Sequence, residues 1–131
     1  LSPIYETAAV GFEGDNFYNL VSFFQTNLNL PDIESILKDI EDQSGRDRTQ
    51  KKFSARTLDI DLLLFDEEIL HSQGIDIPRN EILKYSFVLK PLVDIAPSLI
   101  HPETNKSMVE HWNLFQLEHK KEVEQIKEVY L

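Results

Sequence analysis

Two aspartates, Asp59 and Asp61, stand one residue apart inside a run of apolar residues. The flanking residues alternate as they do in a β-strand, with apolar side chains at Leu58, Ile60, Leu62 and Leu64. On a strand, residues i and i+2 point to the same face, with Cα atoms about 6–7 Å apart. Two such carboxylates can bind the same hard cations, and Mg²⁺ in proteins takes few carboxylates together with the phosphates of a substrate. The run 58–65 is therefore predicted to be a strand carrying a magnesium and polyphosphate site; the alternative is a pair that only faces solvent on an edge strand.

A cluster of cations directly precedes this pair. The chain has a net charge of −10, yet three of its four arginines lie in residues 46–56, together with two lysines: Arg46, Arg48, Lys51, Lys52 and Arg56. Phosphoryl transfer depends on metal ions and on cationic side chains that stabilise the charge of the transferred group. Arginine suits this task because its guanidinium binds phosphate oxygens in two-pronged fashion. Alone, these residues could form a solvated loop. Beside the aspartates, they indicate a loop that closes over a nucleotide and excludes water.

The composition narrows the class of protein. A length of 131 residues fits one domain. The absence of cysteine excludes disulfides and thiolate metal sites, and it is compatible with a cytoplasmic location. The acidic net charge argues against a nucleic-acid binder, and no apolar run approaches the roughly 20 residues of a membrane span. Small molecules are the expected partners, and the oligomeric state stays open.

Hydrophobic periodicity predicts the elements around the site. A helix is expected from Pro31 to Gly45, with an apolar stripe formed by Ile33, Ile36, Leu37 and Ile40. Residues 1–7 and 19–26 are predicted strands, the second of them in the core. Further along the chain we expect a returning strand near residues 67–70, a short extended segment at 75–78, an apolar run at 86–95 that Pro91 breaks, and a helix over 107–117. Residues 118–131 are compatible with helix or strand.

The run from Arg56 to Phe65 closely resembles the signature of the 6-hydroxymethyl-7,8-dihydropterin pyrophosphokinases, which act in folate biosynthesis. The resemblance extends over most of the chain in several ordered blocks: Tyr5-Glu6-Thr7, Asn16-Phe17-Tyr18-Asn19, Glu41 through Arg48, Ile77-Pro78, Ser86 through Leu92, and Ile95-Ala96-Pro97. It implies one α+β domain over residues 1–131 with a ferredoxin-like arrangement. It also implies transfer of the β,γ-pyrophosphoryl unit of ATP to the pterin hydroxymethyl oxygen, with two Mg²⁺ ions and release of AMP.

The resemblance also implies roles for individual residues. Asp59 and Asp61 would hold both metal ions, and Arg46 and Arg56 would grip the phosphates as catalytic residues. The remaining nucleotide contacts would come from Arg48, Lys52, Leu62 and Arg79. The pterin would lie between Phe17 and Phe87, with further contacts from Thr7, Val10, Asn19 and Phe53.

The sequence departs from the family pattern at several positions. The family commonly opens with a strand, a Gly-Ser-Asn loop and a helix, and these are absent from residues 1–131. Because the chain opens at Leu1 without Met, we expect an N-terminal piece before it. Arg79 stands where the family commonly has a histidine, Tyr85 where it has an arginine, and Ser54 where glycine or alanine is usual. A non-catalytic nucleotide- or pterin-binding relative, and a structural domain whose acidic pair only binds cations, are the alternatives to an enzyme.

Overall fold

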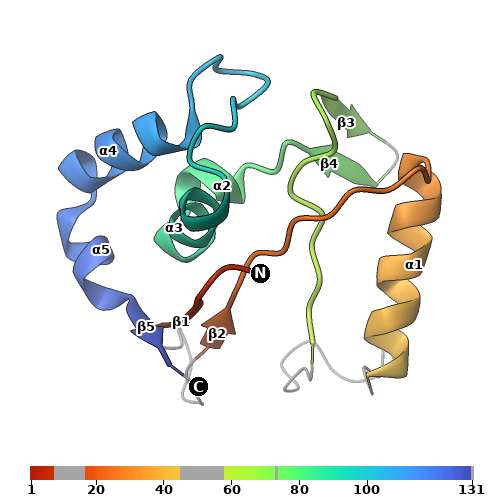
Figure 1. The fold of residues 1–131 in the computed structure, drawn as a ribbon, viewed down its shortest axis with the longest axis horizontal. Coiled ribbons are helices and arrows are strands. Elements are labelled where there is room, and N and C mark those ends of the chain that lie inside the picture. The colour runs from red at the N-terminus through yellow and green to blue at the C-terminus, as the bar shows by residue number, and fades with distance from the viewer. Residues whose placement is uncertain (8–16, 45–57, 73, 131) are drawn as a thin grey trace.

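The computed structural model describes residues 1–7, 17–44, 58–72 and 74–130. Figure 1 shows its elements, which follow the chain in the order β1 (Ile4–Thr7), β2 (Phe17–Asn19), α1 (Leu30–Gln43), β3 (Leu70–Ser72), β4 (Ile75–Ile77), α2 (Glu81–Lys84), α3 (Ser86–Ile95), α4 (Met108–Glu118), α5 (Lys120–Gln125) and β5 (Lys127–Val129).

β1 is the central strand of a three-stranded antiparallel sheet with the order β2-β1-β5. Tyr5 lies opposite Asn19 on one side and opposite Glu128 on the other. The first and last strands of the chain therefore pair with each other (Figure 1). The segment 118–131, for which helix and strand were both open, contains one of each: α5 and β5.

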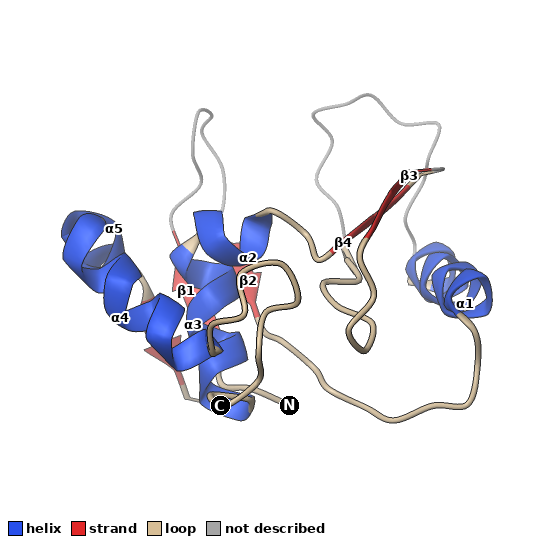
Figure 2. Ribbon diagram, turned by 90° about the horizontal axis from the view of Figure 1, so that it is seen from above, coloured by secondary structure: helices blue, strands red, loops and turns tan. Residues whose placement is uncertain are grey.

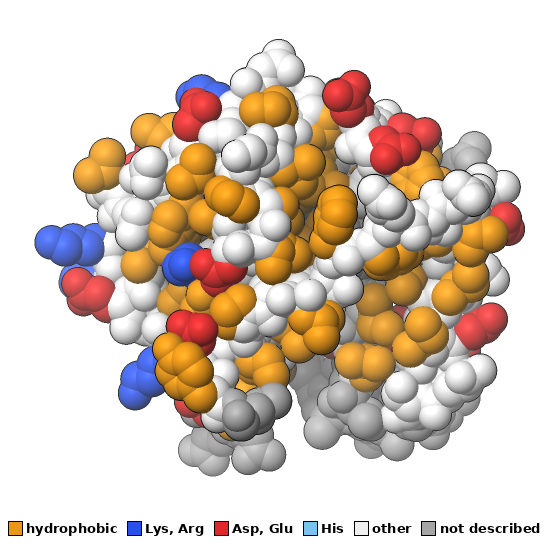
Figure 3. Space-filling model, in the orientation of Figure 1, with side chains coloured by type: hydrophobic (Ala, Val, Ile, Leu, Met, Phe, Trp, Pro, Cys, Tyr) orange, Lys and Arg blue, Asp and Glu red, His pale blue; other side chains and the backbone are white. Residues whose placement is uncertain are grey.

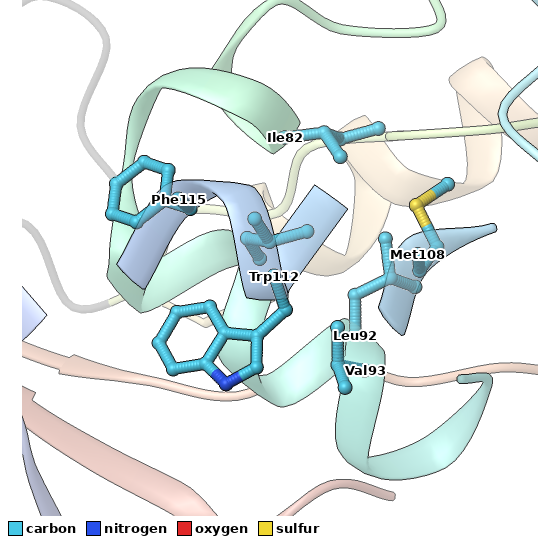
Figure 4. Packing of buried hydrophobic residues seen from close by; sticks show 7 residues of the cluster. Ile82, Leu92, Val93, Met108, Trp112 and Phe115 are labelled. Atoms are coloured by element: carbon cyan, nitrogen blue, oxygen red, sulfur yellow. The ribbon is translucent and has the colours of Figure 1, made fainter. Parts of the chain in front are cut away.

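The hydrophobic core lies between α2, α3 and α4 (Figure 4). Seven buried side chains form it: Ile82, Leu89, Leu92, Val93, Met108, Trp112 and Phe115. Ser107 caps α4 by accepting a hydrogen bond from the Glu110 amide, so the helix predicted over 107–117 is confirmed. The predicted break at Pro91 is wrong, because α3 continues through this proline, which is buried.

α1 confirms the helix predicted from Pro31. Asn29 caps it by accepting a hydrogen bond from the Asp32 amide at 3.0 Å, and Pro31 occupies the first turn, where a missing N–H costs nothing. The predicted apolar stripe is only partly right, since Ile36 and Ile40 are 42% and 41% exposed. The buried residues of the helix are Leu30, Ile33 and Glu41.

Two predicted strands are wrong. Beyond β2, residues 20–29 have no regular structure, and all of them except Val21 are exposed; Val21 is held by two hydrogen bonds with Ser2. Within the described part of the chain, no strand pairs with 58–65. Alternation of apolar residues produces a strand only where a partner offers backbone hydrogen bonds, and this segment is held by other contacts described below.

β3 and β4 form a separate antiparallel hairpin, with Leu70 opposite Ile77 and Gly74 at a positive φ of 79° in the turn. The returning strand near 67–70 and the extended segment 75–78 are thus confirmed.

Viewed from above, the helices α2 to α5 gather on one side with the three-stranded sheet, while the hairpin and α1 lie on the other (Figure 2). The predicted α+β class is confirmed. None of the helices that the structure describes is long and apolar enough to cross a membrane.

Candidate functional site

Asp59 and Asp61 lie in the extended segment 58–65, which runs beside α1 (Figure 1). Both aspartates are exposed, and Ile60 between them is half-buried. The Ile60 amide donates a hydrogen bond to Oε2 of Glu41 at 3.0 Å. The backbone between the two carboxylates is therefore anchored to the C-terminal turn of α1, although the segment pairs with no strand among the described residues.

Glu41 contacts the candidate site, and sequence reasoning assigned no role to it. Its side chain is 7% exposed, on the same helix face as the buried Ile33 and the half-buried Leu37. These three residues recur at i, i+4 and i+8. A carboxylate in line with two apolar residues needs a polar partner, because burial of an unpaired charge is costly. The position of Glu41 on the apolar face of the helix was the sequence signal that could have revealed its contact with the aspartate segment.

Arg79 follows the hairpin and lies next to Asp61. Its Nη1 is 3.8 Å from Oδ1 of Asp61, and its backbone amide donates to the carbonyl of Leu63 at 3.0 Å. Glu81 holds the rest of the guanidinium, through Nε to Oε2 at 3.1 Å and Nη2 to Oε1 at 3.2 Å. Burial alone would lower the pKa of Arg79, but the carboxylates of Asp61 and Glu81 raise it overall, so the guanidinium stays charged.

The donor set at Asp59 and Asp61 fits a magnesium ion that a substrate helps to bind. Within the described ranges, no group of three or more histidine, cysteine or carboxylate side chains is arranged to hold a metal. Two exposed carboxylates leave most of the coordination sphere of Mg²⁺ to water and to phosphate oxygens, as this ion prefers. Such a donor set would hold the ion mainly together with a polyphosphate.

Half of the predicted phosphate and pterin contacts lie outside the described residues. These are Val10, Arg46, Arg48, Lys52, Phe53 and Arg56. Leu62 is described: it is half-buried and directly follows the aspartate pair. The predicted nucleotide residues that the structure brings together are thus Asp59, Asp61, Leu62 and Arg79.

Three of the predicted pterin residues lie on adjacent strands. Thr7 on β1 is directly opposite Phe17 on β2, and Asn19 is opposite Tyr5. Side chains of paired residues, and of residues two apart, share one face of a sheet. Tyr5 is buried and donates its hydroxyl hydrogen bond to Asp94 of α3, so this face is the one that α3 covers.

Phe87 near the start of α3 belongs to an aromatic pair. Its ring stacks on that of Tyr85, with centroids 5.0 Å apart and an angle of 19° between the planes. Phe87 and Tyr85 are half-buried and Phe17 is 48% exposed, so neither phenylalanine is a closed core residue. Sequence reasoning noted Tyr85 only as a departure from the family pattern and missed its ring contact.

Exposed apolar residues are numerous on β2, on the segment that follows it and on α1. Those of 17–28 and of α1 are Phe17, Tyr18, Leu20, Phe23, Phe24, Leu28, Ile36 and Ile40. Figure 3 shows hydrophobic side chains spread over both halves of the viewed face. Part of the apolar surface of α1 and of the segment before it is therefore open to solvent.

The chain is similar to proteins of known name. A family model described as 7,8-dihydro-6-hydroxymethylpterin-pyrophosphokinase matches residues 1–97. The 2-amino-4-hydroxy-6-hydroxymethyldihydropteridine pyrophosphokinase of Aquifex aeolicus is 33% identical over 111 residues, which are 84% of this chain and 69% of the relative. The protein of the same name from Bacillus subtilis is 32% identical over 117 residues, covering 86% and 70%.

A longer relative shows the same similarity. The folic acid synthesis protein fol1 of Pneumocystis carinii is 35% identical over 112 residues, which are 85% of this chain but 15% of that protein. The chain thus spans about two-thirds of the bacterial relatives and a small part of the fungal one. Because the family model covers most of the chain, and the aspartate pair lies within the match, the chain belongs to the 7,8-dihydro-6-hydroxymethylpterin pyrophosphokinase family.

Proposed function

We propose that this chain transfers the pyrophosphoryl group of ATP to 6-hydroxymethyl-7,8-dihydropterin and releases AMP, as a step of folate biosynthesis. The observation that carries the proposal is the arrangement at Asp61. Two exposed aspartates lie on a segment anchored by Glu41, and a charged arginine stands 3.8 Å from the second aspartate. Family membership supplies the substrates.

The reaction forms one bond to phosphorus and breaks one. The pterin hydroxymethyl oxygen forms a bond to the β-phosphorus of ATP, and the bond between that phosphorus and the oxygen carried by the α-phosphorus breaks. AMP leaves with this oxygen and its electron pair, and the hydroxyl proton is released. Bound Mg²⁺ supplies neutralisation of the phosphate charge and of the negative charge that develops on the leaving oxygen.

On this proposal, the residues of the chain bind and orient. Asp59 and Asp61 hold two Mg²⁺ ions together with the triphosphate, and Arg79 neutralises a phosphate beside them. Leu62 lies near the adenine. The cations of 46–56 complete the phosphate site: Arg46 and Arg56 grip the transferred group, and Arg48 and Lys52 close over it.

The pterin binds to the aromatic residues of the same site. Phe17 and Phe87 stack on its two faces, since flat rings stack well on each other. Asn19 bonds the pterin edge, and the backbone from Thr7 to Val10 and the Phe53 ring complete the contacts. The pairing of β1 with β5 supports treating residues 1–131 as one pyrophosphokinase domain.

The test is an activity assay on the purified chain. With Mg²⁺, ATP and 6-hydroxymethyl-7,8-dihydropterin, chromatography should detect AMP and pyrophosphorylated pterin in equal amounts. Neither product should form when the pterin or the metal is omitted. Nucleotide or pterin binding without AMP release would identify a non-catalytic relative. A chain that binds neither ligand in calorimetry would contradict both the enzyme and the non-catalytic binding relative.

A further inference from the structure

Both the backbone and the side chain of Arg79 are held by hydrogen bonds. Its backbone is fixed on both sides, because its amide donates to Leu63 and its carbonyl accepts from the amide of Ile82 at 3.2 Å. Ile82 is fully buried in the core. The Cα of Arg79 is therefore tied both to the aspartate segment and to the helical core, and only its long side chain is left to be oriented.

Glu81 fixes that side chain. The two oxygens of its carboxylate bind Nε and Nη2 of Arg79, at 3.1 and 3.2 Å, in the paired geometry that suits guanidinium and carboxylate. A guanidinium has five N–H donors. Glu81 uses two of them, which leaves three, and the free Nη1 group lies on the side of Asp61.

Asp61 is too far from Arg79, at 3.8 Å, and too exposed, at 60%, for a strong pair of their own. The free donors of Arg79 thus lie beside a proposed metal ligand without being saturated by it. A phosphate oxygen of a metal-bound nucleotide can bind these donors while Glu81 keeps its grip on the opposite edge of the guanidinium.

We propose that Glu81 is a positioning residue, which orients the Arg79 guanidinium so that its remaining donors face the phosphates of the metal–nucleotide complex at Asp61. This inference rests on the proposed function for the identity of the ligand. It assigns a task to a carboxylate that touches neither metal nor substrate. It also explains how an arginine, with its many side-chain conformations, has a defined direction at this position.

The first measurement tests the orientation without any ligand. The side-chain Nε–H signals of arginine are observed by ¹⁵N NMR, and the Arg79 signal is identified by its absence in Arg79→Lys. We expect slow exchange of this proton with water in the native chain and fast exchange in Glu81→Ala. Fast exchange in the native chain, or no change in Glu81→Ala, would overturn the positioning role even if the chain is an active enzyme.

The second measurement tests the consequence for the nucleotide, with a non-hydrolysable ATP analogue and Mg²⁺ in calorimetry. We expect Glu81→Ala to weaken binding roughly 3- to 10-fold, Glu81→Gln to weaken it less because one acceptor oxygen remains, and Glu67→Gln, an exposed control, to leave it unchanged. In an Arg79→Ala background, Glu81→Ala should have no further effect.

Equal losses with and without Arg79 would show that Glu81 acts by another route and would overturn the proposal. Absence of nucleotide binding in the native chain contradicts the proposed function and the phosphate part of this inference. The exchange measurement still decides whether Glu81 orients Arg79, so the two failures are distinguishable.

Discussion

The hydrogen bond from Ile60 to Glu41 allows a quantitative prediction, because it joins α1 to the backbone between the two aspartates. Glu41→Ala removes the acceptor and leaves a partly buried amide without it. Such a loss costs about 2 kcal/mol. For a domain of this size, each kcal/mol corresponds to about 4 °C in the melting temperature. The variant should therefore melt about 8 °C lower than the native chain.

Two further variants separate the hydrogen bond from other effects. Glu41→Gln keeps an acceptor oxygen at the same place but loses the charge, which roughly halves the strength of such a bond. Its loss should be about 1 kcal/mol. Asp39→Ala removes an exposed carboxylate from the same helix and should change stability by less than about 0.5 kcal/mol.

The activity of the same variants tests the link to the site. Groups that orient metal ligands typically contribute about 10- to 100-fold to metal affinity or activity. We expect Glu41→Ala to raise the Mg²⁺ concentration needed for half-maximal AMP release by roughly this factor, measured well below its melting temperature. Thermal unfolding by circular dichroism and AMP release with increasing Mg²⁺ provide the data. A Glu41→Ala variant with the native melting temperature and the native Mg²⁺ dependence would show that Glu41 does not anchor the aspartate segment.

Other substitutions probe the remaining parts of the account. Asp61→Ala should abolish AMP release and leave the circular dichroism spectrum unchanged, because the side chain is 60% exposed; undiminished turnover would remove it from the site. Arg56→Ala should slow transfer by as much as about 10³-fold, and single-turnover rates equal to the native ones would exclude it. Burial, and then the hydrogen bond to Asp94, raise the pKa of Tyr5 well above its ordinary value of 10.0. The folded state therefore holds the hydroxyl proton more tightly than the unfolded chain does, and the free energy of unfolding falls as pH rises above about 10. In denaturant unfolding, Tyr5→Phe should flatten that decline, and an equally steep decline would contradict the assignment. Tyr85→Leu removes a ring stack and should raise the KM for the pterin about 2- to 10-fold; an unchanged KM would show that the stack does not support the pterin.

Local signals in the sequence were sufficient for several elements. Asn29 and Pro31 mark the start of α1, and Ser107 marks the start of α4, because caps act within one turn of a helix. The returning strand near residues 67–70 and the extended segment at 75–78 were also predicted from local chemistry, although their pairing as a hairpin was not. These predictions depend on neighbours along the chain, which a single sequence contains.

The segments that were mispredicted depend on distant partners. The run 58–65 alternates like a strand, but in the described residues its contacts come from the Glu41 side chain and from the amide of Arg79 rather than from a ladder. Alternation reports which faces are apolar and says nothing about whether a neighbouring strand exists. For the same reason, the apolar stripe on α1 could not reveal that Ile36 and Ile40 are exposed while Ile33 is buried.

Sequence reasoning proposed the residue types of the candidate site but only some of its contacts. The spacing of Asp59 and Asp61 indicated a metal pair, and the family resemblance added Arg79. The contact of Arg79 with Glu81 depends on how the chain turns after the hairpin, and the Tyr85–Phe87 stack depends on the bend between α2 and α3. Neither turn has a sequence signature of its own.

Asp59 and Asp61 are proposed to share divalent ions with a nucleotide. This sharing is tested by calorimetric titration of a non-hydrolysable ATP analogue into the native chain and into the Asp59→Asn, Asp61→Asn double variant, each with and without Mg²⁺. We expect binding to the native chain only when Mg²⁺ is present, and no measurable binding to the double variant under either condition. Native affinity in the double variant, or binding to the native chain that is indifferent to Mg²⁺, would contradict it.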